Sequence, residues 1–153
     1  MAKLILIGIL LILSCGKTTS GALDAENIWI DDYSVALTMS QETGKPILIN
    51  FTGSDWCVWC MRLAEEVFNQ AAFLRFAEEN LILLMIDFPR NIKQPDEVVN
   101  NNRVLAQRYN IAGFPTIFII DKDEEVIATT GYRPGGVEAY IQHLEGMIVD
   151  SSP

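Results

Sequence analysis

The sequence predicts an α/β domain, a central mixed β-sheet covered by helices on both faces. Three observations support this prediction. Two continuous apolar runs, residues 47–51 and 81–88, lie between turn residues and are typical of strands buried on both faces. Segments with helical periodicity alternate with these runs, which indicates helices packed over a sheet. Nearer the C-terminus a polar turn separates two further apolar runs, and the hairpin that this predicts makes the sheet mixed.

The first elements follow from local signals. The apolar triplet at 28–30 predicts a short strand. The aspartates at 31 and 32 then predict the N-terminus of a helix that runs to about residue 41. We expect Val35, Ala36 and Met39 to share one face of this helix. The sequence TGKP ends it before the strand at 47–51.

The remaining elements follow from the same periodicities. After the strand at 47–51, a helix begins at two cysteines, and a break at Asn69 separates it from a helical stretch that ends at residue 80. Prolines at both ends of PRNIKQP mark a loop over residues 89–95. The later elements are a helix over 96–109, strands over 116–121 and 125–131 that flank a turn at 122–124, and a helix over 137–148.

Composition limits the class of protein. The chain has 153 residues, half of them hydrophobic and a fifth charged, which suits one globular domain with one core. Twenty acidic and eleven basic residues give a formal net charge of -9. Nucleic-acid binding depends on clustered Lys and Arg, so nucleic acid is not an expected partner.

The N-terminal sequence MAKLILIGILLILSC predicts export. Its apolar run over residues 4–13 is shorter than the ~20 residues of a membrane-spanning helix and predicts a secretory signal peptide over residues 1–14. The ending ILSC resembles the lipobox of bacterial lipoproteins, which are cut before a cysteine that is then lipidated. This resemblance implies lipidation of Cys15, a tether over residues 15–26, and a domain over residues 27–153 that is anchored on the periplasmic side of a bacterial membrane. The alternative is an ordinary signal peptide with a chance cysteine.

The cysteine count agrees with lipidation. The chain has three cysteines, an odd number for an exported protein. Lipidation of Cys15 leaves Cys57 and Cys60 as a pair in a compartment where disulfides persist. A metal site would need a full set of Cys or His ligands, and only His143 is available besides this pair, so we expect no metal. We expect His143 itself to be a solvated helix residue.

The segment SDWCVWC, residues 54–60, contains the residues expected to carry chemistry. Two buried core thiols are one interpretation of the pair. However, the pair follows a buried strand and opens a helix, so Cys57 is expected at a helix N-terminus, where free N–H groups and the helix dipole stabilise a thiolate. Cys60 lies one turn further in and is expected to be more shielded. We therefore expect Cys57 to attack and Cys60 to resolve.

The order of these features resembles the thioredoxin superfamily. A buried strand, Trp-Cys-x-x-Cys and a helix are followed much later by GFPT, residues 113–116, just before a hairpin. The strings FTGSDWC, MIDFPR and GYRPGG are similar to exported bacterial thioredoxin-like proteins and to periplasmic thioredoxin-like domains of transmembrane disulfide reductases. The resemblance covers residues 28–146 and implies a thioredoxin fold.

The resemblance also implies roles for residues around the dithiol. Pro115 would be cis and face the cysteines, and the backbone of Gly113 and Phe114 before it would receive the substrate chain. A trans proline at the start of a strand is the alternative. Trp56 matches a family tryptophan that shapes the surface beside the attacking cysteine, although it could also fill the core. Trp59 has no counterpart in thioredoxin itself, and we expect a partly exposed side chain that contacts substrate or covers the dithiol.

One departure from thioredoxin concerns the proton of the resolving thiol. Asn50 occupies the strand position that holds a buried acid in thioredoxin, and the run LILLMI lacks the lysine that accompanies that acid. An amide cannot accept the proton, so the acceptor for Cys60 is left open. Asp55 is a nearby candidate.

Together these inferences predict an exported, lipid-anchored, monomeric thiol–disulfide oxidoreductase that acts on protein disulfides through Cys57 and Cys60 without a cofactor. The resemblance favours a reductase that receives electrons from a membrane electron-donor protein. An isomerase or an oxidase would use the same residues. A lipoprotein that only binds partner chains, without catalysis, is the alternative from a different class.

Overall fold

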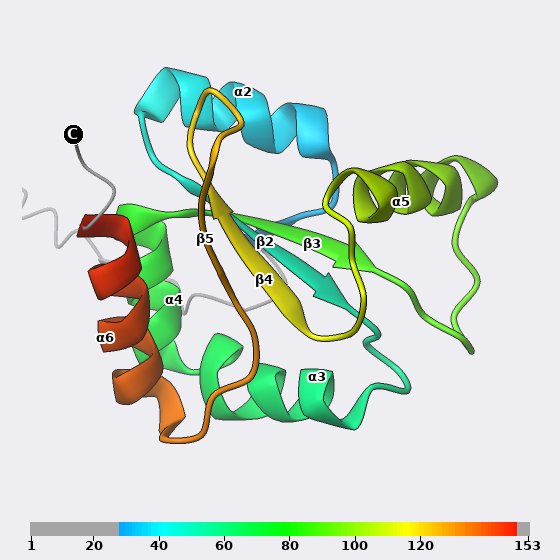
Figure 1. Cartoon of the computed structure of the whole chain (residues 1–153). Helices are drawn as coiled ribbons and strands as arrows, with labels where there is room; N and C mark the ends of the chain where they lie inside the picture. Colours follow the sequence, from blue (N-terminus) through cyan, green and yellow to red (C-terminus); the bar gives the residue numbers. More distant parts are fainter. Residues whose placement is uncertain (1–27, 150–153) are drawn as a thin grey trace, which may run out of the picture.

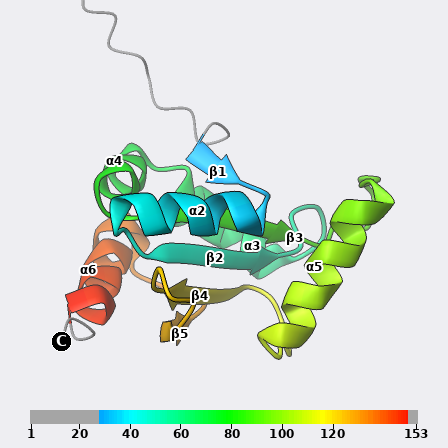
Figure 2. The same cartoon turned by 90° about the horizontal axis from the view of Figure 1, so that it is seen from above.

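The computed structural model describes residues 28–149. The predicted signal peptide, Cys15 and the tether lie outside these residues. Five strands form one sheet in the order β1-β3-β2-β4-β5. Figure 1 shows the arrows of its three central strands, β3, β2 and β4. Strands β1 (Trp29–Ile30), β3 (Ile82–Asp87) and β2 (Ile47–Thr52) are parallel, while β4 (Thr116–Ile120) and β5 (Val126–Thr130) continue the sheet antiparallel. The predicted mixed sheet is confirmed, and Figure 2 shows β1 and β5 at its two edges.

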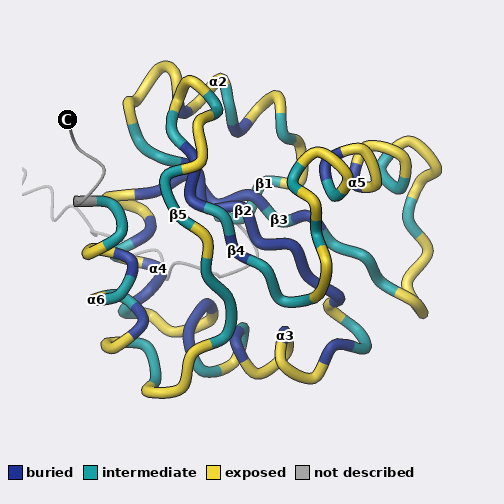
Figure 3. The backbone as a smooth tube through the Cα atoms, in the orientation of Figure 1, coloured by how far each residue is buried: buried dark blue, intermediate teal, exposed yellow. Residues whose placement is uncertain are grey.

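Strand β2 is the centre of the sheet, and every one of its residues is buried (Figure 3). Its Leu48 contributes to a core with helices α4 (Ala71–Asn80) and α6 (Gly136–Val149). Its odd-numbered residues contribute to a second core with α2 (Tyr33–Thr43) and α5 (Asp96–Arg108). The prediction of helices on both faces is thus confirmed, and the continuous apolar runs reflect burial on both sides.

Helix α2 begins where predicted, but the face that it buries differs from the expected one. Oδ1 of Asp32 accepts hydrogen bonds from the backbone N–H groups of Ser34 and Val35, at 2.8 and 3.1 Å, and caps the helix. Ala36 is buried, but Val35 and Met39 are 48% and 38% exposed, so the expected face is wrong for both. The buried stripe runs instead through Ala36 and Ser40, four residues apart. Ser40 is tolerated there because its hydroxyl donates to the carbonyl of Lys45, at 2.6 Å.

The helix that follows β2 is divided into three parts. Helix α3 (Val58–Leu63) continues into a π-helical segment, η1 (Ala64–Phe68), and α4 begins after Asn69 and Gln70. The predicted break at Asn69 is therefore confirmed, but the π-helical turn was not predicted. Such turns are rare and often occur near functional sites.

The C-terminal hairpin and helix pack together. Oδ1 of Asp121 accepts hydrogen bonds from the backbone of Asp123 and Glu125, both at 2.9 Å, and stabilises the turn between β4 and β5. On α6, His143 is partly buried, and its Nε2 lies 2.9 Å from Oγ1 of Thr130 on β5. Partial desolvation lowers the pKa of His143, so the prediction of a solvated helix residue is only partly correct.

None of the helices within residues 28–149 combines the length and the apolar character needed to cross a bilayer.

Candidate active site

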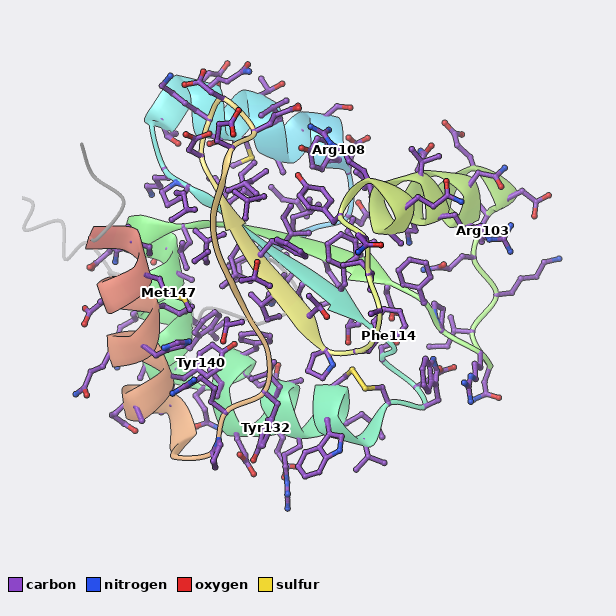
Figure 4. All side chains as sticks on the ribbon, in the orientation of Figure 1. Arg103, Arg108, Phe114, Tyr132, Tyr140 and Met147 are labelled. Atoms are coloured by element: carbon purple, nitrogen blue, oxygen red, sulfur yellow. A yellow bond between two sulfur atoms is a disulfide. The ribbon has the colours of Figure 1, made fainter. Side chains whose placement is uncertain are left out.

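Cys57 and Cys60 form a disulfide at the start of α3, with their Cα atoms 5.2 Å apart (Figure 4). Cys57 is the N-cap residue of the helix, in the extended conformation that precedes helical geometry. Its Sγ accepts a hydrogen bond from the backbone N–H of Cys60, at 3.2 Å. Strand β2 leads into this turn, so the centre of the sheet fixes the position of the sulfurs. A thiolate at Cys57 would accept this hydrogen bond and would lie at the positive end of the helix dipole.

The two sulfurs differ little in exposure. Cys57 is 7% exposed and Cys60 is 4% exposed, so both are buried in the oxidised protein. The expected shielding of Cys60 is present, but the difference between the two residues is small. The helix N-terminus, rather than exposure, distinguishes Cys57 from Cys60.

Trp56 joins three segments next to the disulfide. Its Nε1 donates to the carbonyl of Phe88 at 2.7 Å, and the guanidinium of Arg90 lies 3.7 Å from the centre of its ring. The ring also meets Phe114 edge-on, with centroids 5.8 Å apart. A Cβ on Gly53 would lie 2.5 Å from Cε2 of this ring, so the turn after β2 needs a glycine to admit the indole. Trp56 therefore packs against the loop after β3 and the segment before β4, next to Cys57 in the sequence.

Asp55 holds the loop that follows β3. Its Oδ1 accepts from the N–H of Arg90 at 2.9 Å, and its Oδ2 accepts from those of Asn91 and Ile92 at 2.6 and 3.2 Å. These backbone hydrogen bonds, the one from Arg90 first, lower the pKa of Asp55. Both oxygens are therefore engaged on the side of this loop. Asp55 is therefore an anchor for this loop.

Trp59 lies on the other side of the disulfide and is 51% exposed. Its ring centroid lies 5.1 Å from that of Tyr132, and the guanidinium of Arg62 lies 5.4 Å from its centre. Glu66 holds both neighbours, because it accepts a hydrogen bond from the Tyr132 hydroxyl at 2.9 Å and pairs with Arg62 at 3.2 Å. An exposed indole fixed in this way offers a preformed apolar contact next to the sulfurs.

The segment before β4 completes the surface. The Phe114–Pro115 peptide bond is cis. The carbonyl of Gly113 accepts from Oγ1 of Thr116 at 2.7 Å. Within the described part of the chain, the backbone N–H and C=O of Phe114 make no hydrogen bond, so both are available to another chain.

A cavity of about 640 Å³ lies behind the disulfide, and Asn50, Cys60 and Asp87 are among the residues that line it. Asn50 is 5% exposed and its Oδ1 has no hydrogen-bond partner. Asp87 ends β3, and its carboxylate accepts from the backbone N–H and the hydroxyl of Ser54, at 2.9 and 2.6 Å. Its carbonyl accepts from Nδ2 of the buried Asn102, at 2.8 Å.

Sequence reasoning did not identify Asp87 or Asn102 as part of the site. The available signal for Asp87 was an acid at the end of a buried strand, next to the strand that leads to the cysteines. Asn102 gave a weaker signal, because a single asparagine in a polar helix does not distinguish a buried position from an exposed one.

Comparisons with known proteins agree with this site. The model of the thioredoxin-like domain family matches residues 33–145. The disulfide bond reductase DsbH of Chlamydia pneumoniae is 35% identical over 124 residues, which make up 81% of this chain and 75% of that protein. A solved structure of DsbH oxidoreductase matches with a TM-score of 0.76 at 35% identity, covering 79% of this chain and 83% of that one.

A more distant structure shares the fold. The solution structure of a thioredoxin from Thermus thermophilus matches with a TM-score of 0.63 at 19% identity, over 86% of this chain and 91% of that chain. The predicted thioredoxin fold is therefore confirmed. The Cys57–Cys60 pair and the similarity to DsbH make the protein a thiol–disulfide oxidoreductase. The chain belongs to the thioredoxin-like domain family.

Proposed function

We propose that the protein reduces disulfides of exported proteins, with Cys57 as the attacking thiolate and Cys60 as the resolving thiol. The observation that carries this proposal is the position of Cys57 Sγ at the N-terminus of α3, where it receives the N–H of Cys60. A thiolate is the nucleophile in disulfide exchange, and this position favours the thiolate form. The similarity to a protein named disulfide bond reductase supports the direction of the reaction.

The reaction transfers two electrons from the dithiol to the substrate. The Cys57 thiolate attacks one sulfur of the substrate disulfide, forms a mixed disulfide and releases the other sulfur as a thiolate, which takes up a proton. Cys60 then loses its proton and attacks Cys57 Sγ, releasing the second substrate thiolate. The protein is left with the Cys57–Cys60 disulfide seen in the structure. A membrane electron-donor protein would restore the dithiol.

Water in the cavity behind the disulfide is the proposed acceptor for the Cys60 proton. Asn50 and Cys60 line the same cavity, and Asn50 carries no group that titrates near neutral pH. Asp55 is engaged by the loop after β3, as described above. The cavity has room for water and carries polar groups to hold it.

Substrate would dock over the surface formed by Trp56, Trp59 and Phe114. Phe114 offers unpaired backbone groups that could bond an extended substrate chain. Trp59 offers exposed aromatic area on the other side of the sulfurs. In this arrangement Gly113 and Pro115 position the Phe114 backbone, and the substrate chain crosses the disulfide between the two tryptophans.

Export and anchoring are part of the proposal. Residues 1–14 would act as a signal peptide, Cys15 would be lipidated, and residues 15–26 would tether a monomeric domain to the periplasmic face of a membrane. Stable anchoring requires more than one acyl chain, as in bacterial lipoproteins. Mass spectrometry of the mature protein tests this directly. A mature chain with an unmodified Cys15 would rule out the anchor but not the redox function.

Insulin reduction and the redox potential test the activity. We expect the wild-type protein to speed insulin reduction by dithiothreitol and Cys57→Ser to abolish the effect. Equilibration with glutathione should give a redox potential of about -270 mV for a reductase, while about -120 mV would indicate an oxidant. A protein that fails to reduce insulin but still binds partner chains would be a non-catalytic binding protein.

A further inference from the structure

The cavity behind the disulfide is lined by only one of the two cysteines. Among the described residues, its wall includes Cys60 but not Cys57. Most of the wall is apolar, and the largest apolar side chains on it are those of Trp29, Ile30, Met61, Phe68, Met85 and Val98. Cavities of this size with apolar walls and a few polar groups are typical sites for small molecules.

The ionisable side chains that line the cavity are all acidic, and its amides and hydroxyls can both donate and accept hydrogen bonds. Asn50 contributes an Oδ1 that is buried and has no partner. Carboxylates of Asp31, Glu65 and Asp87 also line the cavity, and no Lys, Arg or His is found among the described lining residues. A buried acceptor without a partner is destabilising, and a ligand N–H would satisfy it. The site therefore suits a small molecule that carries hydrogen-bond donors and a positive charge.

We propose that this cavity binds small aminothiols and their disulfides, and that they exchange with Cys60 from the side away from Cys57. The ammonium group would lie near the carboxylates and donate to Asn50 Oδ1, while the short aliphatic chain would contact the apolar wall. The sulfur would then lie against Cys60. This inference rests on the proposed redox function, because it uses the same disulfide, but it assigns a second entrance and a different class of reactant.

In the proposed reaction the aminothiol reduces the Cys57–Cys60 disulfide. A thiolate R–S⁻ attacks Cys60 Sγ and the Cys57–Cys60 bond breaks. Cys57 leaves as a thiolate that accepts the hydrogen bond from the N–H of Cys60. A leaving thiolate that is stabilised leaves faster, and a position at a helix N-terminus stabilises a thiolate. A second R–S⁻ then attacks the R sulfur of the mixed disulfide. The products are R–S–S–R and the reduced dithiol, whose Cys60 takes up a proton.

The two entrances would separate substrates by size. A cavity of about 640 Å³ has room for a small molecule but not for a folded protein substrate. Protein substrates would use the surface at Cys57, and small aminothiols the cavity at Cys60. The acidic cavity would also disfavour anionic thiols such as glutathione.

The test uses the full chain with Cys57→Ser, reduced, and three small disulfides. Cystamine is cationic, 2-hydroxyethyl disulfide is neutral and oxidised glutathione is anionic. The rate of mixed-disulfide formation at Cys60 is followed by peptide mass spectrometry and divided by the rate of the same reagent with N-acetylcysteine. We expect cystamine to exceed the neutral reagent by at least about threefold, as for a partly exposed ion pair. Glutathione should be the slowest.

Three further substitutions in this background assign the effect to the cavity. Asp87→Asn keeps a partner for Ser54 but removes a charge, and should reduce the ratio of the cystamine rate to the rate of the neutral reagent. Ala64→Leu adds volume to the cavity wall and should slow both reagents. Ala71→Leu adds the same volume at an exposed site on α4, outside the cavity, and should change neither.

Two outcomes would overturn the inference: equal normalised rates for the three reagents, or a preference for cystamine that Asp87→Asn leaves intact. Insulin reduction by the wild-type protein is measured in parallel. Loss of that activity would refute the proposed reductase without affecting the labelling of Cys60, so the two failures are distinguishable.

Discussion

The backbone N–H of Cys60 donates to Sγ of Cys57, at 3.2 Å, so the sulfur of one cysteine caps the helix that carries the other. The capping position stabilises negative charge on Cys57. Cys60, one turn inside the helix, lacks this advantage. We therefore expect different roles for the two sulfurs although their exposure is nearly equal.

This difference predicts which variant traps a protein substrate. Cys60→Ser should accumulate mixed disulfides through Cys57, because attack proceeds but resolution cannot. Cys57→Ser should form none with a protein substrate. Non-reducing electrophoresis followed by peptide mapping identifies the linked cysteine. Protein adducts through Cys60 in Cys57→Ser would reverse the assignment.

Gly53→Ala should destabilise the protein by about 1–3 kcal/mol, the usual cost of overpacking. The new methyl group would lie 2.5 Å from the ring of Trp56, which is held by its hydrogen bond to Phe88. Urea denaturation measures the change. Gly146→Ala on α6 is the matched control, because its Cβ meets nothing within 4 Å and alanine favours the helix. Equal effects in the two variants would contradict the close contact.

Asp55→Asn should lower the melting temperature at neutral pH, because an amide accepts the three backbone hydrogen bonds less strongly than a carboxylate. The pKa of Asp55 is lowered in the folded protein, so its contribution is complete above the unfolded value of about 3.9 and is lost as the pH falls through the folded value. The difference between wild type and variant should therefore shrink below about pH 4. Glu79→Gln, at an exposed position on α4, is the control. A difference that persists in acid would show that the charge is not involved.

Asn50→Asp should reduce stability at neutral pH by about 1–3 kcal/mol, because burial raises the pKa of the introduced acid. The cost should be absent below the unfolded pKa of about 3.9, grow as the pH rises through it, and be complete above the folded pKa. Denaturation at several pH values measures this. Above the folded pKa the acid should also speed release of a mixed disulfide by taking the proton of Cys60, which stopped-flow kinetics can follow.

Asn50→Leu is the control for burial without charge. It removes an acceptor that has no partner, so stability should be unchanged or higher at every pH. An Asn50→Asp variant whose release step is unchanged or slower across the pH range would show that this position does not exchange protons with Cys60.

Trp59→Ala should weaken the use of protein substrates. The exposed indole, held by Tyr132 and Arg62, is expected to act as an interface hot spot, so its loss should raise KM for a protein disulfide by about fivefold or more. The rate with cystamine should not change, because Trp59 does not line the cavity behind the disulfide. If both substrates were slowed equally, Trp59 would act on the dithiol itself, as a cover.

The sequence was sufficient for the fold because its strongest signals are local. Strands β2 and β3 are continuous apolar runs, and buried parallel strands leave few other interpretations. The helix boundaries followed from capping residues such as Asp32. The buried face of α2 was predicted wrongly because Ser40, a polar residue satisfied by a nearby carbonyl, replaces an apolar residue in the buried stripe.

The site was predictable only in part. The cysteines, Trp56 and the segment at Phe114 each belong to a recognisable string. Asp87 contacts Ser54 across 33 residues of sequence, and Asn50 lacks a partner only because of how side chains pack around the cavity. Such relations depend on the register of β2 and β3 and on the π-helical turn after α3, which no short pattern specifies.

The register of β2 and β4 has a practical consequence. Ile47 pairs with Ile120 at one end of β2, and Phe51 pairs with Thr116 at the end that leads to the cysteines. The Asp121 turn therefore lies a whole strand length from the disulfide. A fluorophore or an affinity tag placed in this turn would give a handle on the working protein, one that leaves its reactive end open.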